Sequence, residues 1–475
     1  MRPDIIFYQQ YAVPYFGILA LSSHLRQNKF KTDVIIDSLE RDSINALCDL
    51  HPYIVGISVL STEHSWLISQ VQKIKEVLPE TTIIVGGIHA MFYYEEILSD
   101  STVDIVCHSE GEEVLINLIK ELQSSSPDLS LIEGIAYRGE KEEIITTPRA
   151  PLVSFKDEII EDRDIYYKRY PQLQYDSVHR FFSSRGCPYR CSFCYNASIQ
   201  EIFKGKGVYI RQKSPIKFIQ EIVSQCKKYP ITSIFFFDDL FTFNKDWLRQ
   251  FLSMYKEQVS LPFLCTTRAN VMDEETGHML ADAGCRTVFY GIESGDYRLR
   301  KHVLHKDITD DMIIRCGNII KMNSLKAQTT NMFCLPDENI TYAFKTIELN
   351  IKAKTDYAMC ALFLPFPKTS ITDYCKEKGY IKKDYSLKDV PYSFFTKSVL
   401  ENENKREITN VHFLAYYFIK WPWLFYKCKN IVSFTFLWPV YYFLFLFGNF
   451  LRLKGERGIS FFHAIRYAWR LRKAF

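Results

Sequence analysis

Three cysteines in one short segment are the residues of this chain whose types and spacing point most directly to chemistry. Cys187, Cys191 and Cys194 lie four and three residues apart in the run Ser-Arg-Gly-Cys-Pro-Tyr-Arg-Cys-Ser-Phe-Cys. Gly186 and Pro188 disfavour a regular helix or strand across this run, so we expect a loop. Three thiolates on one loop can bind three corners of an iron–sulfur cube and leave its fourth iron open to another ligand.

A zinc site and three unrelated thiols are the alternatives for these cysteines, and both stay open at this point. A zinc ion normally takes a fourth protein ligand, often from paired C-x2-C clips, and the chain has no second clip of that kind. The spacing and the flanking residues favour a [4Fe-4S] cluster held by Cys187, Cys191 and Cys194.

Further motifs follow the cysteines in the chain. They are Phe237-Asp238-Asp239 after an apolar segment, Thr267-Arg268-Ala269-Asn270, and Tyr290-Gly291-Ile292-Glu293-Ser294-Gly295. With these motifs, and with the aromatic Phe193 just before the last cysteine, residues 179–385 resemble the radical S-adenosylmethionine (SAM) superfamily.

This resemblance implies that the open iron binds the amino and carboxylate groups of SAM, and that one electron splits SAM to give a 5′-deoxyadenosyl radical. It also implies that Phe193, Asp238, Asp239, Arg268 and Glu293 surround SAM. Charged residues that end barrel strands also form purely structural ion pairs, and this alternative stays open.

Composition limits the class of protein. The 475 residues suggest two or three domains, and the net charge of +4 gives no reason to expect a nucleic-acid partner. Thirteen cysteines, an odd number, do not form a secreted disulfide framework. The first residues lack the apolar run of a signal peptide. We therefore expect a cytoplasmic protein.

Strand-like and helix-like segments alternate in residues 1–125. The expected strands cover 4–8, 31–37, 53–60, 81–88 and 103–107, and helices are expected between and after them. Such a pattern predicts an α/β domain with a doubly wound parallel sheet of the flavodoxin type. Ligands of these sheets bind at the carboxyl ends of the strands, here the loops 58–62, 86–90 and 109–112.

A domain of this kind ahead of a radical SAM core resembles the cobalamin-binding domain of cobalamin-dependent radical SAM enzymes. The resemblance implies that the cobalamin region contains Ser58, Gly86, Gly87, His89, Glu110 and Gly111. The D-x-H-x-x-G motif that supplies a histidine to cobalt is absent, so His89 is not assigned as a cobalt ligand. A solvated loop histidine, and a domain that keeps the fold without the cofactor, are the alternatives.

The remaining segments complete the predicted domain organisation. Residues 126–178 are expected to form a linker with a β-hairpin around Arg138-Gly139-Glu140. Residues 179–385 repeat a strand–helix pattern that predicts an incomplete (β/α)6 barrel resembling a TIM barrel, with the cysteine loop at the mouth of its strands.

Residues 386–475 form an aromatic and basic C-terminal region that we expect to be helical. No charged residue occurs from 431 to 451, a length that could cross a bilayer, and from Lys405 onward the chain has twelve Lys or Arg and two Glu. Basic residues on both sides favour a segment lying on an anionic cytoplasmic membrane surface, with contact through 411–457. A helical cap packed on the barrel is the alternative.

The combined prediction is an enzyme with a [4Fe-4S] cluster, SAM and cobalamin that methylates an unactivated carbon of a small-molecule or lipid-like, for example isoprenoid, substrate. A cobalamin-dependent cyclase or rearrangement enzyme is the runner-up. A tRNA methylthiotransferase and a non-catalytic membrane adaptor are weaker alternatives. The expected partners are the substrate and a reducing protein such as flavodoxin or ferredoxin.

Overall fold

The computed structural model describes residues 2–154, 160–391 and 393–457. Contacts between residues divide the chain into two compact units. The first contains residues 1–176 and 200–211, and the second contains 177–199 and 212–475. Each unit is considered by itself below. The domain boundaries expected at residues 125, 178 and 385 stay predictions.

The first unit is built on a sheet with the strand order β2-β1-β3-β4-β5-β6-β7. Strands β1 to β5 pair in parallel, whereas β6 and β7 pair antiparallel at one edge. This order confirms the predicted doubly wound sheet of the flavodoxin type. The strands are β1 (Ile5–Gln9), β2 (Thr32–Ile36), β3 (Ile54–Ser58), β4 (Thr82–Gly86), β5 (Ile105–Cys107), β6 (Ile135–Arg138) and β7 (Ile144–Thr146).

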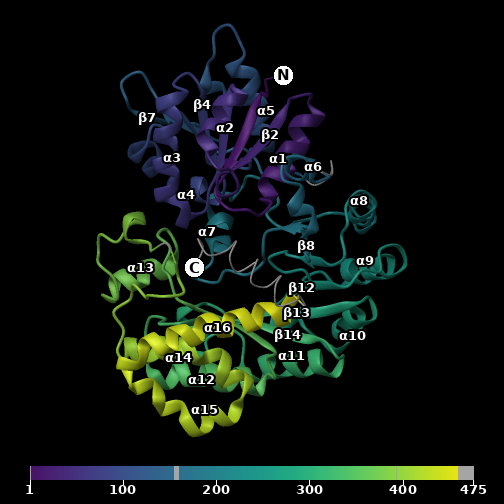
Figure 1. Ribbon diagram of the computed structural model, residues 1–475, viewed down its shortest axis with the longest axis vertical. Coiled ribbons are helices and arrows are strands. Elements are labelled where there is room, and N and C mark those ends of the chain that lie inside the picture. Colours follow the sequence, from purple (N-terminus) through teal and green to yellow (C-terminus); the bar gives the residue numbers. More distant parts are fainter. Residues whose placement is uncertain (1, 155–159, 392, 458–475) are drawn as a thin grey trace. The chain divides into compact units, whose positions relative to one another are not determined.

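Helices cover both faces of this sheet (Figure 1), with α1 and α5 packed together on one side and α2, α3 and α4 on the other. They are α1 (Phe16–Gln27), α2 (Ser43–Leu50), α3 (His64–Val77), α4 (Ile88–Asp100), α5 (Gly111–Leu122) and the short α6 (Asp164–Tyr167). The central strands are buried on both faces because each is almost entirely apolar, as in Ile5–Gln9. The predicted hairpin is formed by β6 and β7, which extend the sheet.

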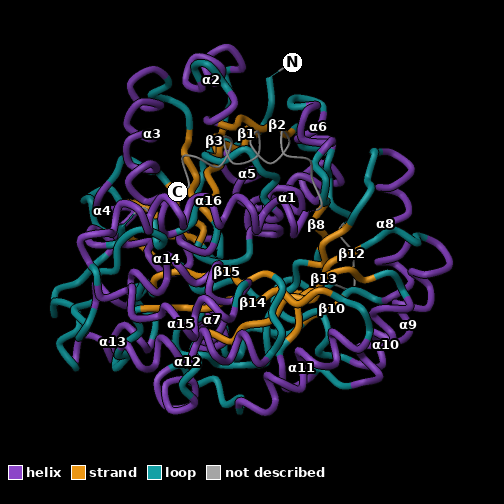
Figure 2. The backbone as a smooth tube through the Cα atoms, turned by 60° about the horizontal axis from the view of Figure 1, so that its bottom comes forward, coloured by secondary structure: helices purple, strands orange, loops and turns teal. Residues whose placement is uncertain are grey.

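The second unit contains an all-parallel sheet with the order β15-β14-β13-β12-β11-β8. Figure 2 shows β12 to β15 side by side, with α10, α11 and α12 along one side of them. This arrangement confirms the predicted incomplete barrel. Its strands are β8 (His179–Phe181), β11 (Ile234–Phe236), β12 (Phe263–Thr267), β13 (Cys285–Glu293), β14 (Lys326–Phe333) and β15 (Tyr357–Leu362); β9 (Ser184–Arg185) and β10 (Arg211–Gln212) are two further short strands.

Local sequence fixes where the outer helices begin. The side chains of Ser214, Asn244, Asp273, Thr309 and Asn339 each accept a backbone N–H in the first turn of α8 to α12. These helices are α8 (Pro215–Lys228), α9 (Lys245–Gln258), α10 (Glu274–Asp282), α11 (Asp310–Met322) and α12 (Ile340–Lys352), with α7 (Tyr195–Ile202) and α13 (Ser370–Glu377) as further helices of the chain.

The C-terminal region is helical, as expected. Figure 1 shows α14 (Lys405–Lys420) beside α12 and α16 (Trp438–Arg457), with α15 (Pro422–Cys428) at the turn between α14 and α16. One face of α14 packs against β14, β15 and α12 in a shared apolar core. The alternative of a helical cap packed on the barrel is therefore correct for α14.

Candidate functional site

The cysteine loop joins β9 to α7. Gly186 has a φ of +90°, a backbone conformation that favours glycine, just before Cys187. A backbone hydrogen bond from Cys194 to the carbonyl of Cys191 (3.1 Å) folds the end of the loop into a turn. Helix α7 begins at Tyr195, so the three cysteines lie on irregular backbone, as predicted.

Ser192 holds this loop in place, and sequence reasoning did not identify it. Its backbone N–H donates to the carbonyl of Leu304 (3.0 Å), and its hydroxyl donates to the carbonyl of Val303 (2.6 Å). Its own carbonyl accepts the N–H of Ile371 (3.3 Å). The residue between the second and third cysteines is thus tied to two distant segments of the barrel.

Two side chains direct N–H groups at the cysteine sulfurs. Arg268 Nη1 lies 3.4 Å from Cys191 Sγ, and Asn196 Nδ2 lies 3.6 Å from Cys194 Sγ. The Arg268 guanidinium is also stacked over the ring of Tyr189, 3.8 Å from its centroid. N–H donors near thiolate sulfurs stabilise the ionised form and tune bound iron–sulfur clusters. The donor set therefore fits a cluster held by this loop.

Burial opposes ionisation of the thiols before metal binds. It raises the pKa of Cys187 to about 11, and it also raises the pKa of Cys194. Assembly of a cluster would therefore release protons from this loop. Within the described residues, no three His, Cys, Asp or Glu side chains are grouped around one metal-ion position.

Asp238 and Asp239 follow β11 and differ in role. Asp238 is buried, and its Oδ1 accepts the N–H of Ser183 (3.0 Å) and the hydroxyls of Ser183 (2.8 Å) and Ser184. Burial raises the pKa of Asp238 to about 6. Asp239 has an exposed side chain. The protein around it still removes part of its hydration, and this desolvation raises its pKa. Asp238 thus shapes the backbone leading into the loop, and a contact of either residue with SAM stays a prediction.

Glu293 ends β13 in a left-handed conformation, with a φ of +66°. Its Oε1 accepts Lys306 Nζ (2.9 Å) and the Thr330 hydroxyl (3.1 Å). Gly291 makes room for this pair, because a Cβ there would lie 1.9 Å from Glu293 Oε1 and 2.4 Å from Lys306 Nζ. Lys306 is a partner that sequence reasoning missed. The contact of Glu293 with SAM stays a prediction.

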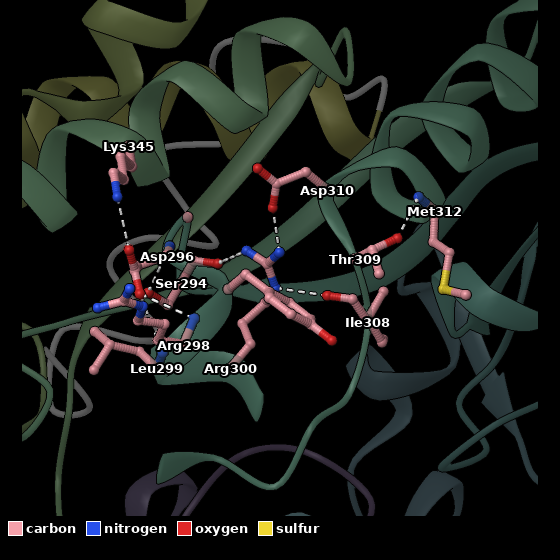
Figure 3. Close-up of polar contacts among 12 residues, drawn as sticks. Ser294, Asp296, Arg298, Leu299, Arg300, Ile308, Thr309, Asp310, Met312 and Lys345 are labelled. Atoms are coloured by element: carbon pink, nitrogen blue, oxygen red, sulfur yellow. Dashed lines mark hydrogen bonds and ion pairs between the residues drawn. The ribbon is translucent and has the colours of Figure 1, made fainter. Parts of the chain in front are cut away.

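A fully buried arginine supports the segment after Glu293. Figure 3 shows Arg300 between Ser294, Ile308 and Asp310, donating to the carbonyls of Ser294 (2.7 Å) and Ile308 (2.9 Å) and pairing with Asp310. Arg300 lies in a π-helical turn, Leu299–Val303, whose last carbonyl accepts Ser192. Arg300 therefore supports the turn that binds Ser192 of the cysteine loop. No motif in the sequence identified it.

Two more residues complete this support. Asp296 binds Lys345 of α12 (2.8 Å), as Figure 3 also shows. Phe193 packs against an apolar cluster that includes Leu299, Val303 and Leu304. The side chain before the third cysteine thus contacts the same turn that Ser192 binds, while its contact with SAM stays a prediction.

In the first unit, the loops at the carboxyl ends of β3 and β4 are lined by small residues. Gly87 has a φ of +94°, and a Cβ there would lie 3.0 Å from Ser58 Oγ and 3.1 Å from the Val59 carbonyl. At Gly86, among the described residues, a Cβ would meet only Cys107, at 4.0 Å. Gly87 therefore lets the loops after β3 and β4 pack together, and the open side of Gly86 leaves room for a large flat ligand, which fits a corrin.

His89 is not a solvated loop residue. It belongs to α4, which starts at Ile88, within the segment 86–90 that was expected to be a loop, and its side chain is buried. Its Nε2 is 3.0 Å from His64 Nδ1, and its Nδ1 is 3.2 Å from Ser61 Oγ. Both ring nitrogens are therefore engaged inside the unit. This agrees with leaving His89 out as a cobalt ligand.

Glu110 and Gly111 lie at the start of α5. Both carboxylate oxygens of Glu110 accept Arg211, at 2.6 and 2.7 Å, and one also accepts the N–H of Val153 (2.7 Å). A Cβ at Gly111 would meet Leu21, at 3.1 Å. The structure thus gives Glu110 a structural ion pair, and a role for either residue at cobalamin stays a prediction.

Buried Glu63 supports the loop after β3. Its Oε2 accepts the N–H of Leu60 (2.6 Å), and its Oε1 accepts the hydroxyl of Tyr15 (2.8 Å). Burial raises the pKa of Glu63 to about 7. The Leu60 side chain is about half exposed, so this loop presents an apolar residue.

Two family models match the chain: the B12 binding domain over residues 5–119 and the Radical SAM superfamily over 181–349. An uncharacterised methyltransferase of Pyrococcus horikoshii is 28% identical over 374 residues, covering 76% of this chain and 78% of the relative. The anaerobic magnesium-protoporphyrin IX monomethyl ester cyclase of Rubrivivax gelatinosus is 24% identical over 358 residues, covering 73% of this chain and 62% of the relative.

Solved structures share the fold. OxsB, determined with aqua-cobalamin and SAM bound, aligns with a TM-score of 0.70 at 16% identity, covering 99% of this chain and 75% of OxsB. The methyltransferase TsrM from Kitasatospora setae, determined with cobalamin and a [4Fe-4S] cluster, aligns with a TM-score of 0.66 at 16% identity, covering 80% of this chain and 78% of TsrM.

Proposed function

The chain belongs to the cobalamin-dependent radical SAM enzymes, and we propose that it methylates an unactivated carbon of a small-molecule or lipid-like substrate. Its cofactors are a [4Fe-4S] cluster, SAM and cobalamin. The methyltransferase names of the Pyrococcus relative and of TsrM support methyl transfer. The observation that carries the proposal is the cysteine loop, with the side-chain N–H donors of Arg268 and Asn196 aimed at the sulfurs of Cys191 and Cys194.

Different side chains of the chain would bind the cluster and stabilise its charge. Cys187, Cys191 and Cys194 would hold the cluster, and Arg268 and Asn196 would stabilise charge on two of the sulfurs. When bound, the cluster and cobalamin supply reductive cleavage of SAM and carriage of the methyl group.

Glu293 and Asp239 are the acidic groups we propose for SAM, near its ammonium or ribose. Lys306 fixes the position of Glu293 through the 2.9 Å ion pair, and Thr330 adds a second contact. Such preorganised groups favour catalysis because they need not rearrange during the reaction.

The deciding experiment is anaerobic reconstitution with cobalamin and methyl-labelled SAM, followed by mass spectrometry of a small-molecule and lipid extract. Label in an extracted compound would support the proposal. The C191A variant is the negative control, and C226A, in α8, is the matched cysteine control. Failure of the wild-type protein to cleave SAM at all would contradict the radical reaction.

A second candidate keeps the three cofactors without methyl transfer, as a cyclase or rearrangement enzyme. The similarity to the Rubrivivax cyclase favours it. In the same experiment, 5′-deoxyadenosine and a changed but unlabelled substrate would support this candidate instead.

We also propose a reducing environment and a reducing partner such as flavodoxin or ferredoxin. None of the thirteen cysteines, all of which lie within the described residues, forms a disulfide. This composition suits the cytoplasm, where thiols stay reduced. Turnover of the reconstituted protein with reduced flavodoxin or ferredoxin in place of a chemical reductant tests the partner.

A further inference from the structure

The C-terminal helices and the turns between them carry many exposed large apolar side chains. We call Trp423, Tyr426, Phe436, Trp438, Phe443 and Phe447 the aromatic surface. Phe436 is 74% exposed and Phe443 is 67% exposed. Within the described residues, one helix, Thr435–Glu456, is long and apolar enough to cross a membrane, and 22% of its most apolar window is buried. An exposed apolar area of this kind marks an interaction site.

The opposite stripe of α16 is fixed to the folded unit. Tyr441 and Phe445 are buried in the core shared with α14. Gly448 allows the helices to approach closely, because a Cβ there would lie 3.2 Å from Tyr416 and Tyr417. The Tyr417 hydroxyl donates to the Leu444 carbonyl (2.9 Å).

The far end of α16 is also anchored. The Tyr357 hydroxyl of β15 donates to the Gly455 carbonyl (3.0 Å), and Arg452, which pairs with Glu456 one turn along the same helix (2.7 Å), is buried against the unit. A membrane-crossing α16 would have to leave α14 and expose its core. The helix can instead contact a membrane lengthwise without losing these interactions.

The segment of the chain that carries the aromatic surface is basic. Lys420, Lys427 and Lys454 are exposed, and the sequence has no Asp or Glu from 408 to 455. Lys429 lies over the rings of Phe344 and Phe425, at 5.2 and 5.5 Å. Exposed Trp, Tyr and Lys around an apolar strip match the interface between acyl chains and anionic headgroups.

We propose that the aromatic surface docks in the plane of an anionic lipid bilayer, with α16 lying along it and not crossing it. The inference depends on contacts within the second unit and not on methyl transfer. It would nevertheless give the enzyme access to substrates that partition into membranes.

The test is flotation of full-length reconstituted protein with vesicles of phosphatidylcholine alone or with phosphatidylglycerol added. We expect binding to the anionic vesicles that weakens with salt. The F436S/F443S variant should bind about tenfold or more weakly, because it removes two inserted rings. The control I216S/M322S removes two exposed apolar side chains on α8 and α11 and should bind like the wild type.

A second pair of variants tests the charge. K420Q/K427Q should lose about tenfold or more of its affinity for anionic vesicles, whereas K382Q/K383Q, with exposed lysines outside this region, should not. Absence of flotation would overturn the proposal. So would a loss of vesicle binding in the two control variants that is as large as the loss in the two test variants. A vesicle-free dimer that F436S/F443S dissociates would overturn it in favour of a second copy of the chain. SAM cleavage by each variant in vesicle-free buffer reports separately on the cofactor chemistry.

Discussion

The cysteine loop of the second unit and the strand-end loops of the first unit present ligands with different kinds of surface. Around the cysteines, Arg268 and Asn196 aim donors at sulfur. In the first unit, His89 and Glu110 are engaged with protein partners, and the loop after β4 consists of glycine.

This difference indicates two ways of binding a cofactor. The second unit would hold its cluster by thiolate–iron bonds and by N–H donors aimed at the sulfurs. Replacing a single one of these side chains should therefore strongly weaken cluster binding. The first unit would hold cobalamin by backbone shape, so added bulk should matter more than lost polarity. The following predictions test this contrast, beginning with the largest effect.

Replacing Cys191 by alanine should abolish cluster assembly. One corner of the cube would lose its only protein ligand, so iron should fall from about four atoms per chain to nearly none. Iron and sulfide analysis with electron paramagnetic resonance after anaerobic reconstitution measures this. A normal cluster in C191A would show that the loop does not bind it in the proposed way.

Replacing Arg300 by methionine should lower the free energy of unfolding by about 3 kcal/mol, because two buried carbonyls and Asp310 lose their donor. Urea unfolding of the apoprotein measures the change. The exposed Arg315, 3.9 Å from Glu274, offers the control R315M, which should cost about 0.5 kcal/mol or less. R300K keeps the positive charge but loses the planar set of guanidinium N–H donors. An altered cluster spectrum in this variant would show that Arg300 positions the cysteine loop.

Replacing Gly87 by alanine should cost about 2 kcal/mol and weaken cobalamin binding. The new Cβ would meet Ser58 and Val59, and the backbone conformation favours glycine. Absorbance titration with cobalamin and urea unfolding measure the two effects. The control is G17A in α1, where no atom of the part of the chain that the structure describes lies within 4 Å of an added Cβ. Stronger loss of cobalamin in E110Q than in G87A would contradict binding by shape.

Sequence predicted the fold well because the fold has a local signature. Apolar strands alternating with helices require a parallel sheet, and both predicted sheets are present. The predicted loop 86–90 was too long, because Gly86-Gly87 is typical of a loop while α4 begins immediately after it, at Ile88. A solvated loop histidine was therefore an alternative for His89, whereas its side chain is buried.

The candidate site was predictable only where its residues sit in motifs. The cysteines and Glu293 lie at strand ends, which the barrel pattern brings to one edge. Ser192 and Arg300 were missed because their partners are carbonyl groups, which any residue provides. Arg300 also lies in a charged run, Arg298 to Lys301, and such runs usually face solvent. Only the folded chain shows that this member is fully buried.

The smallest effect concerns pH and the loop after β3. Burial raises the pKa of Glu63 from 4.5 to about 7 in the folded chain. Between these values the folded state holds a proton that the unfolded state has released, so stability falls as pH rises. From pH 6 to 8 this group alone should remove about 1 kcal/mol.

E63Q, which resembles the protonated acid, should remove this part of the pH dependence. Urea unfolding of the apoprotein at both pH values measures it, with E113Q, an exposed residue of α5, as the control. An unchanged slope in E63Q would mean that Glu63 stays ionised when buried. The N–H of Leu60 would then donate to an ionised carboxylate. The loop after β3 would be held by a directed, charged hydrogen bond, as the cysteine loop is held by directed donors.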